Sequence, residues 1–451
     1  MCGIVGIYDK GNINAANGAY YGLVALQHRG QESAGIAINN DGIITCYKDM
    51  GYVNEVFDDK ILSLLKGDMA IGHVRYSTSG ASFAANAQPI LIKFKNGNLA
   101  MAHNGNLVNA EALREQLEDQ GMIFSTTTDS EVIAALIARN YKGDIVNAIQ
   151  DTMDMVKGSY ALVIMTVDKL IAVRDGYGLR PLVIGKLDDG YALASESCAL
   201  DTLGAEFMRD VKPGEIIVID KDGMKSMASS IKMPKKGCLF EYIYFARPDS
   251  IIDGISMYKA RENAGKILAE EQPAIADTVI SVPDSGTPAA IGYANESGIP
   301  YSVGLIKNRY VGRTFIQPTQ SMRELGVKLK LNPLKGNIKG KRVVMVDDSI
   351  VRGTTSRKIV KALRDAGATE VHVRVASPPV IHSCHYGIDT PTTEELVGAI
   401  NPVEKIRKYI GADSLGYLSL KGLLASVDSD GDGYCTACLN GEYPIPLDCR
   451  R

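Results

Sequence analysis

A cysteine stands directly behind the first methionine, in the segment MCGIVGIYDK. If Met1 is removed, Cys2 carries a thiol and a free α-amine on one residue. Because an α-amine titrates near pH ~8, part of it is uncharged at neutral pH and can accept the thiol proton. The small residue at position 2 favours removal of Met1. Without catalysis, Cys2 would be a small apolar residue in a first strand.

A thiolate that attacks an amide carbon also needs hydrogen-bond donors for the oxyanion that forms. The segment AHNGNL (102–107) offers two candidates. Asn104 supplies a side-chain amide, and Gly105 supplies a backbone N–H that a ligand can approach closely because glycine has no Cβ. Cys2, Asn104 and Gly105 are therefore the candidate catalytic residues.

A second kind of chemistry is indicated by VVMVDDSIVRGTTSRK (343–358), in which an apolar strand ends at Asp347 and Asp348. The loop that follows is rich in Gly, Thr and Ser and opens a helix. Backbone N–H groups and hydroxyls at a helix N-terminus bind phosphate. The two carboxylates suit a ribose diol or its divalent cation. The segment SVPDSGTPAA (281–290) is similar to a second anion-binding loop, suited to pyrophosphate. For residues 343–358, the alternative interpretation is a capped helix that follows a strand and binds no phosphate.

The chain has eight cysteines, and two of them form the pair Cys435-x2-Cys438. A lone CxxC fits zinc, an iron–sulfur group or a redox pair. No thioredoxin-like strand precedes it, which disfavours the redox reading. Cys46 and Cys198 are expected to be core thiols. The neighbouring DSDGDG (428–433) is not an EF-hand, because Leu439 stands where the bidentate acid is required. His382 and His385, beside Cys384, could ligate zinc but are expected to be structural.

Composition excludes several classes of protein. A formal net charge of −3 gives no electrostatic case for nucleic-acid binding. The most apolar stretch, GSYALVIMTVDKLIAV, contains Asp168 and Lys169 and is too short to span a membrane. No targeting segment is evident, so we expect a cytoplasmic protein whose thiols stay reduced.

The 451 residues predict about two to four domains. Up to about residue 230, short strands alternate with glycine and asparagine, and helices are expected near 17–28, 109–119 and 129–140. Strands in runs with added helices are typical of an α+β layered domain. The basic segment IKMPKKG (231–237) is a plausible boundary. Beyond residue 255 the order strand, loop, helix, strand predicts a parallel sheet. The expected domains are 2–235, 236–410 and a C-terminal tail, 411–451.

Four segments follow MCGIVGI in order: LQHRGQESAGI (26–36), GHVRYST (72–78), AHNGNL and TTTDSE (126–131). Together the five resemble the class II, N-terminal-nucleophile glutamine amidotransferases. The resemblance implies an αββα layered sandwich and a glutaminase reaction. In it, Cys2 attacks the glutamine side-chain amide, ammonia leaves and water hydrolyses the thioester. It also implies that Arg75 binds the glutamine carboxylate and Asp129 its ammonium group.

Residues 343–358 resemble the phosphoribosyl pyrophosphate (PRPP) signature of the type I phosphoribosyltransferases. This resemblance implies an α/β domain with a parallel sheet, with Mg²⁺ held by Ser285, Asp347 and Asp348. The basic segment 307–330 is similar to the flexible hood that closes over PRPP, although a plain solvated loop is the alternative. The expected PRPP-binding residues are Asp284, Ser285, Gly286, Thr287, Asp347, Asp348, Ser349, Arg352, Gly353, Thr354, Thr355 and Ser356.

The two halves, joined by CLFEYIYFARPDS (238–250), resemble over essentially the whole chain a family of glutamine–PRPP transferases, in its iron–sulfur branch. The resemblance implies that glutamine, PRPP and water give 5-phosphoribosylamine, glutamate and pyrophosphate, the committed step of purine nucleotide synthesis. Ammonia would pass from one site to the other. Feedback inhibition by purine nucleotides and a homo-oligomer, a dimer or a tetramer, are also implied. A [4Fe–4S] cluster would be held by Cys238, Cys384, Cys435 and Cys438, with Cys449 as the rival for one position.

Two other functions share some of these features. A sugar-amidating class II enzyme, such as glucosamine-6-phosphate synthase, has the same first half but sugar-isomerase domains behind it, which the 343–356 signature argues against. A PRPP-sensing regulator that lost catalysis would not need Cys2, Asn104, Arg75 and Asp129 together. Glutamine hydrolysis measured with and without PRPP separates the three.

Overall fold

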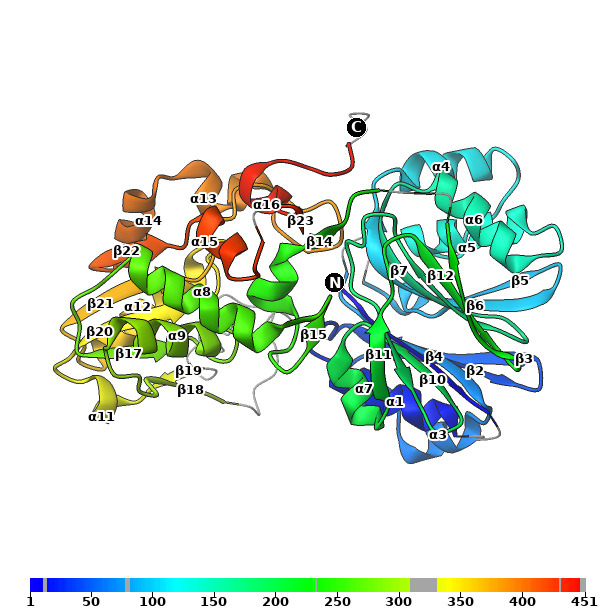
Figure 1. The fold of residues 1–451 in the computed structure, drawn as a ribbon, viewed down its shortest axis with the longest axis horizontal. Helices are drawn as coiled ribbons and strands as arrows, with labels where there is room; N and C mark the ends of the chain where they lie inside the picture. Colours follow the sequence, from blue (N-terminus) through cyan, green and yellow to red (C-terminus); the bar gives the residue numbers. More distant parts are fainter. Residues whose placement is uncertain are drawn as a thin grey trace.

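The protein is seen here in a computed structural model that describes residues 1–10, 14–77, 82–229, 231, 233–308, 331–429 and 431–446. The expected hood, apart from Lys307 and Asn308, and Cys449 lie outside the described residues. The chain forms two bodies that lie side by side, with the first half in one and the second half in the other (Figure 1). Among the described residues, no helix is both long and apolar enough to cross a membrane.

The first body is built on two antiparallel sheets that pack face to face. In spatial order the first sheet contains β11 (Glu206–Asp210), β9 (Val183–Lys186), β10 (Gly190–Ala194), β1 (Gly3–Asp9), β4 (Met69–Arg75), β2 (Ser33–Asn40) and β3 (Ile43–Met50). The second contains β13 (Gly223–Ala228), β12 (Glu215–Asp220), β8 (Leu170–Arg174), β7 (Gly158–Met165), β6 (Gly97–Leu107) and β5 (Ile90–Phe94). Small side chains such as Ala37, Ala100 and Ala161 fill the layer between the sheets and let them approach closely.

Helices cover the outer face of each sheet. On the first sheet lie α1 (Ala15–Ala25) and α7 (Ser197–Leu203), with α2 (Val53–Val56) and α3 (Asp59–Leu64) nearby. On the second lie α4 (Ala110–Glu118), α5 (Asp129–Asn140) and α6 (Ile145–Met155). The expected αββα sandwich is therefore confirmed, and α1, α4 and α5 lie near their predicted positions. The prediction did not include α6, although its buried residues recur at helical spacing after the N-cap Asp144.

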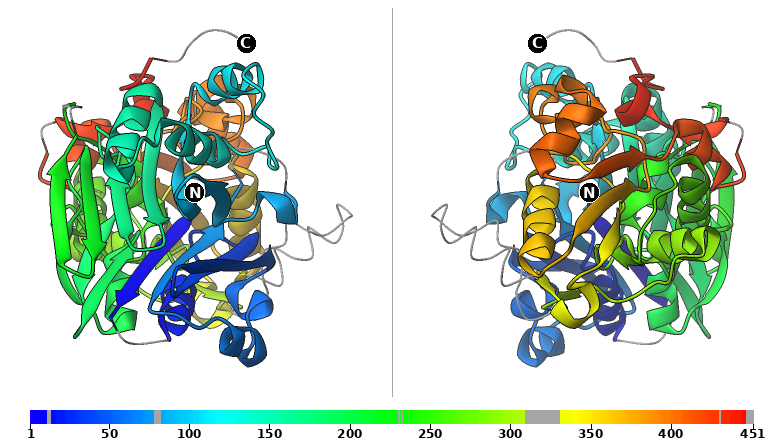
Figure 2. Two further views of the ribbon diagram at one scale, coloured as in Figure 1. Left: turned by 90° about the vertical axis from the view of Figure 1, so that its right-hand side faces the viewer. Right: turned by 90° about the vertical axis from the view of Figure 1, so that its left-hand side faces the viewer.

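The second body contains a four-stranded parallel sheet, as the sequence predicts. Its strands, in spatial order, are β17 (Thr278–Ser281), β20 (Arg342–Asp347), β21 (Glu370–Val375) and β22 (Ser414–Tyr417). Helices α8 (Met257–Glu271) and α9 (Thr287–Ser297) cover one face, while α12 (Thr354–Asp365) and α14 (Val403–Ile410) cover the other (Figure 2). Because β22 completes the sheet, the sheet continues past the expected boundary after residue 410.

The connection between the bodies and the C-terminal tail pair with each other. The strand β14 (Lys236–Cys238) pairs in parallel with β23 (Gly433–Cys435), and α15 (Leu420–Ala425) and α16 (Ala437–Asn440) flank β23 in the sequence. A π-helical turn, Glu241–Phe245, follows β14. The β14–β23 pair and the π-helical turn lie between the two bodies, whereas α15 packs against the second body beside α8 (Figure 1).

The remaining short elements are η1 (Ala84–Asn86), β15 (Ile251–Ile252), β16 (Ile255–Ser256), β18 (Leu305–Lys307), β19 (Leu331–Pro333), α11 (Lys335–Ile338), η4 (Thr393–Glu395) and α13 (Val397–Ile400).

Candidate active sites

Cys2 lies at the start of β1, where the two sheets of the first body meet. Its backbone nitrogen donates a hydrogen bond to Oδ1 of Asn104, on β6 of the other sheet, at 3.1 Å. Its sulfur lies 3.7 Å from the carbonyl oxygen of Tyr76. Because Gly3 pairs with Val74 in the antiparallel β1–β4 ladder, Cys2 falls at the register position opposite Arg75. Burial lowers the pKa of the Met1 α-amine to about 6, against an opposing effect from Cys2.

Asn104 and Gly105 have the properties expected of oxyanion donors. Asn104 is fully buried, and within the described part of the chain its Nδ2 has no hydrogen-bond partner. A buried donor without a partner costs on the order of 1–3 kcal/mol of stability. We therefore expect Nδ2 of Asn104 to donate a hydrogen bond to a bound ligand. A Cβ on residue 105 would lie 2.0 Å from the carbonyl oxygen of Ser159. Only glycine therefore fits at this point of β6.

The two expected glutamine-binding residues flank these groups. Arg75 is buried, and its guanidinium donates to Oε1 of Glu32 at 2.6 Å. Glu32 also accepts a hydrogen bond from the backbone nitrogen of Ser77 at 3.1 Å. Asp129 begins α5, and its Oδ2 accepts a hydrogen bond from the backbone of Leu107 at 2.9 Å. Since Leu107 ends β6, Asp129 is tied to the strand that carries Asn104 and Gly105.

A buried ion network, which the sequence did not predict, lies behind Cys2. The Arg29 guanidinium bridges Glu196 and Glu241, and its Nε donates to the carbonyl oxygen of Cys2 at 3.0 Å. Burial raises the pKa of Glu196, but His28 and Arg29 outweigh it and hold that pKa well below its usual range. Glu241 belongs to the π-helical turn after β14. The network therefore connects the backbone of Cys2 to the junction between the two bodies.

The two anion loops of the second body meet at the carboxyl edge of its sheet. Strands β17 and β20 are parallel neighbours, with Ser281 paired to Val346, so the segments that follow them emerge side by side. The Ser285 hydroxyl in the first loop donates to the carboxylate of Asp348 in the second. In parallel α/β sheets, ligands bind at this edge.

Asp347 and Asp348 form a buried pair of acids, each less than 8% exposed. Burial and the neighbouring charge of Asp348 raise the pKa of Asp347, and burial raises that of Asp348. Asp348 accepts a hydrogen bond from the Ser349 hydroxyl at 2.6 Å. Two adjacent carboxylates with raised pKa values suit a divalent cation, because a cation favours their ionised forms. This donor set therefore fits the expected Mg²⁺.

The remaining residues expected to bind PRPP are placed at two helix N-termini. Gly286 precedes α9, and Gly353, with φ of 73°, precedes α12, whose first residues are Thr354, Thr355 and Ser356. Thr287 is the first residue of α9. Two members are engaged elsewhere at the surface: Asp284 pairs with Lys307 at 2.5 Å, and Arg352 pairs with Glu395 at 3.2 Å.

Comparisons with known proteins agree with the division of the chain into two bodies with different sites. The chain matches a glutamine amidotransferase domain over residues 73–202 and a phosphoribosyl transferase domain over residues 253–377. It is 55% identical to the amidophosphoribosyltransferase of Archaeoglobus fulgidus and 53% identical to that of Bacillus subtilis. Each alignment covers 99% of this chain, and they cover 98% and 94% of those proteins. The chain belongs to the amidophosphoribosyltransferase family.

A solved structure extends the agreement to three dimensions. Glutamine PRPP amidotransferase from B. subtilis, complexed with ADP and GMP, is similar with a TM-score of 0.93 at 53% identity, over 99% of this chain and 98% of that one. The amidophosphoribosyltransferase architecture, with a glutaminase sandwich and a phosphoribosyltransferase sheet, is thereby confirmed.

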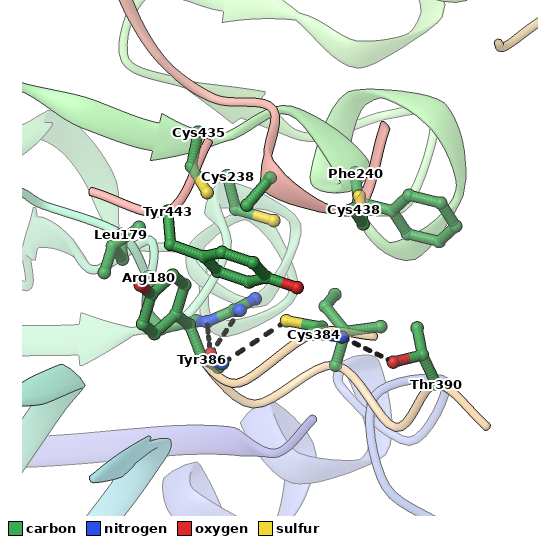
Figure 3. A pocket seen from close by; sticks show the side chains of 12 residues that line it. Leu179, Arg180, Cys238, Phe240, Cys384, Tyr386, Thr390, Cys435, Cys438 and Tyr443 are labelled. Carbon is green, nitrogen blue, oxygen red and sulfur yellow. Dashed lines mark hydrogen bonds between the residues drawn. The ribbon is translucent and has the colours of Figure 1, made fainter. Parts of the chain in front are cut away.

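This member of the amidophosphoribosyltransferase family also has a cavity bordered by the four cysteines that the resemblance singled out. Cys238 and Cys435 are directly paired in the β14–β23 ladder. Cys438 lies on α16, and Cys384 lies in the segment after β21. The four side chains surround one cavity between the bodies (Figure 3). Its other lining residues are Leu179, Arg180, Phe240, Tyr386, Ile388, Thr390, Ala437 and Tyr443.

The electrostatics of the cavity disfavour free thiolates. Burial raises the pKa of Cys238 to about 11 and that of Cys435 to about 12, and it also raises the pKa of Cys438 well above its usual value. In the part of the chain that the structure describes, no group of three or more His, Cys, Asp or Glu residues is arranged to hold a metal ion. The four thiols therefore surround a space without meeting at one point. Neither His382 nor His385 is among the described residues that line it.

Several residues of these sites were missed in the sequence. Arg29 and Glu32 stand in LQHRGQESAGI, a segment that carried the resemblance but to which no role was given. Glu196 and Glu241 stand in otherwise apolar surroundings, YALASESCAL and CLFEYIYF. A charged residue inside an apolar run is the signal that could have found them, because such a residue requires a buried partner. The sequence around a buried charge does not show which residue will be its partner.

Proposed function

We propose that this protein transfers ammonia from glutamine to PRPP, giving 5-phosphoribosylamine, glutamate and pyrophosphate, the committed step of purine nucleotide biosynthesis. The observation that carries the proposal is the contact between Cys2 and Asn104, in which Oδ1 accepts from the Cys2 backbone while Nδ2 stays unpartnered among the described residues. The same chain presents the Asp347–Asp348 pair at the edge of a phosphoribosyltransferase sheet.

The glutaminase half-reaction follows from this contact. Once Met1 is removed, the nitrogen beside Oδ1 of Asn104 is an α-amine, which accepts the proton of the Cys2 thiol. The thiolate attacks the side-chain amide carbon of glutamine. The oxyanion that forms accepts hydrogen bonds from Nδ2 of Asn104 and the backbone N–H of Gly105. When the intermediate collapses, the amine returns the proton to the leaving ammonia, and water then hydrolyses the thioester to release glutamate.

Arg75 and Asp129 would hold the glutamine molecule during this reaction. The guanidinium pairs with the substrate carboxylate and the acid with its ammonium group. Glu32 supports Arg75, because its carboxylate contacts both Arg75 and Ser77. Asp129 is oriented by its hydrogen bond from Leu107.

At the second site, Asp347 and Asp348 would bind the ribose of PRPP or its Mg²⁺, with Ser285 as a further oxygen ligand. Gly286, Thr287, Ser349, Gly353, Thr354, Thr355 and Ser356 would bind phosphate groups at the two helix N-termini, with Asp284 and Arg352 at the rim. When bound, Mg²⁺ would neutralise part of the negative charge on the departing pyrophosphate. The residues themselves position the anomeric carbon for attack by ammonia, so no protein nucleophile is required.

We propose that ammonia passes from the glutaminase site to the PRPP site. A second cavity lies beside the PRPP site, and its lining includes Ser285 and Asp348 together with Tyr242 and Ile243 of the π-helical turn. The neighbouring Glu241 contacts Arg29, which in turn contacts Cys2.

We infer that the cysteine-lined cavity holds a [4Fe–4S] cluster on Cys238, Cys384, Cys435 and Cys438. A cluster spreads its four thiolate ligands around a body of metal and sulfide, whereas zinc draws them to one centre at about 2.3 Å. That all four thiols line one cavity supports this inference. Its role would be structural, because neither half-reaction moves an electron.

Other parts of the proposal rest on the family. The proposed domain limits are 2–235, 236–410 and 411–451, although β22 (Ser414–Tyr417) places the start of the last segment in the second sheet. A homo-oligomer in the cytoplasm, a dimer or a tetramer, is expected. Feedback inhibition by purine nucleotides is supported by the B. subtilis relative, whose structure contains ADP and GMP.

The test measures glutamine hydrolysis and PRPP-dependent synthesis with either glutamine or concentrated ammonia. We expect PRPP to stimulate glutamine hydrolysis, and Cys2→Ser to abolish glutamine-dependent synthesis while ammonia-dependent synthesis persists. Loss of both activities in a folded Cys2→Ser protein would contradict the two-site proposal. Unchanged glutamine hydrolysis with and without PRPP would contradict the coupling between the sites.

A further inference from the structure

We propose that the segment His385–Tyr386–Gly387, which belongs to the second body, positions the oxyanion hole of the first. This inference rests on the proposed glutaminase function of Cys2, Asn104 and Gly105. It assigns to a segment nearly three hundred residues away a role in glutamine chemistry, and the following contacts support it.

Two hydrogen bonds join this segment to the strands that form the oxyanion hole. Nδ2 of Asn106, the residue after Gly105, donates to the carbonyl oxygen of His385 at 3.0 Å. The Ser159 hydroxyl donates to the carbonyl oxygen of Tyr386 at 2.7 Å. Ser159 is the register partner of Asn106, and its hydroxyl also accepts from the Asn106 backbone nitrogen at 3.2 Å. The segment is therefore attached to both β6 and β7 beside residue 105.

Gly387 lies directly against the backbone of Gly105. A Cβ on Gly387 would come within 3.1 Å of the carbonyl carbon and 3.3 Å of the Cα of Gly105. On its other side, Gly105 is bounded by the Ser159 carbonyl, which a Cβ on residue 105 would approach to 2.0 Å. Gly105 thus lies between β7 and Gly387, so a side chain at residue 105 would collide with β7 and a side chain at residue 387 would press on Gly105.

Tyr386 ties the segment to the cysteine-lined cavity and the tail. Its backbone nitrogen donates to the sulfur of Cys384 at 3.3 Å, and its hydroxyl donates to the carbonyl oxygen of Ile445 at 2.7 Å. Its carbonyl oxygen also accepts from Nε of Arg180 at 2.8 Å. The side chain of Tyr386 is almost fully buried. An element anchored on the tail in this way can hold Gly105 at a defined place.

A peptide N–H stabilises an oxyanion only when its position is correct to a fraction of an ångström. Displacement of Gly105 would therefore lower kcat for glutamine. The hydrogen bonds that orient Arg75 and Asp129 come from Glu32 and from the Leu107 backbone, so we expect the KM for glutamine to change less than kcat. The thiol of Cys2 and the PRPP site would be spared.

The test replaces Gly387 with alanine in the full-length enzyme. We expect Gly387→Ala to lower kcat for glutamine about 10- to 100-fold, less than the roughly 10²–10³-fold loss caused by removal of an oxyanion donor. The KM for glutamine, ammonia-dependent synthesis and the rate of Cys2 alkylation by iodoacetamide should stay within about twofold of wild type. Gly143→Ala is the matched control. Gly143 has a φ of 110°, similar to the 99° of Gly387, but a Cβ on Gly143 would have no atom within 4 Å.

Asn106→Ala provides a second variant that keeps the inference testable if Gly387→Ala does not fold. It removes the bond to His385 without adding an atom, and the same selective loss of glutamine kcat is expected. Wild-type kcat in a folded Gly387→Ala or Asn106→Ala enzyme would overturn the inference, as would equal losses with glutamine and ammonia. Failure of the proposed function is distinguishable, because it would appear as retained glutaminase activity in Cys2→Ser.

Discussion

Cys2 and Asn104 are joined by a single hydrogen bond in which the cysteine backbone nitrogen is the donor and Oδ1 of Asn104 the acceptor, at 3.1 Å. This bond fixes the orientation of the amide, so Nδ2 points away from the Cys2 backbone and has no partner among the described residues. One side chain can therefore hold the catalytic nitrogen and stabilise the oxyanion at the same time.

Asn104→Asp should separate these two tasks, because a carboxylate keeps the acceptor and loses the donor. We expect kcat for glutamine to fall about 10²–10³-fold, with a much smaller change in KM. Ammonia-dependent synthesis should persist. Steady-state kinetics with both nitrogen donors measures the effect, and Asn98→Asp, at the other end of β6, is the control. A variant with normal kcat would remove Asn104 from the oxyanion hole.

The double variant Asp347→Asn, Asp348→Asn should abolish use of PRPP with either nitrogen donor while basal glutamine hydrolysis survives. Asparagine keeps the volume of each side chain but removes the negative charge that a divalent cation or a ribose diol requires. Titration calorimetry with Mg²⁺ and PRPP measures the loss directly. Normal PRPP affinity in this variant would refute the assignment of the pair.

Glu196→Gln should make the protein less stable at neutral pH and less sensitive to acid. The folded-state pKa of Glu196 is depressed, so its contribution to stability is present above the unfolded value of about 4.3 and is lost as pH falls towards the folded value. Breaking a buried ion pair costs about 3–5 kcal/mol. The difference in melting temperature between wild type and variant should therefore be largest at pH 7 and shrink below pH ~4.5. Replacement of the exposed Glu118 by Gln is the control. If wild type and Glu196→Gln differed in melting temperature by the same amount at pH 7 as below pH ~4.5, the prediction would be contradicted.

Cys435→Ser should remove the metal group and destabilise the junction between the bodies. Anaerobically purified wild-type protein should be brown, with about four irons per chain, and exposure to oxygen should bleach and inactivate it together. Iron and sulfide analysis with thermal unfolding measures both effects. Cys198→Ser, away from the cavity, should keep the colour, and so should Cys449→Ser. Colourless, fully active protein with one tightly bound zinc would identify a zinc site instead.

The sequence by itself determined what depends on residue type and local spacing. Cys2, Asn104 and the Asp347–Asp348 loop could be proposed as site residues because each stands in a short segment whose residue types suggest a chemistry and resemble a known family. Helices α1, α4 and α5 and the strands β17, β20 and β21 could be placed because their apolar residues follow the patterns of regular structure, whereas β22 was not predicted. In both cases the information lies within a window of a few residues.

Only the tertiary structure decided which distant residues meet. Arg29 and Glu241 are separated by 212 residues, and Asn106 and His385 by 279, yet both pairs are in direct contact. Such contacts depend on strand register and on the packing of one body against the other, which leave no pattern in the neighbouring sequence. A buried charge signals that a partner exists, because its desolvation must be compensated. The identity of that partner is set by the fold, and so is the position of Gly105 between Ser159 and Gly387.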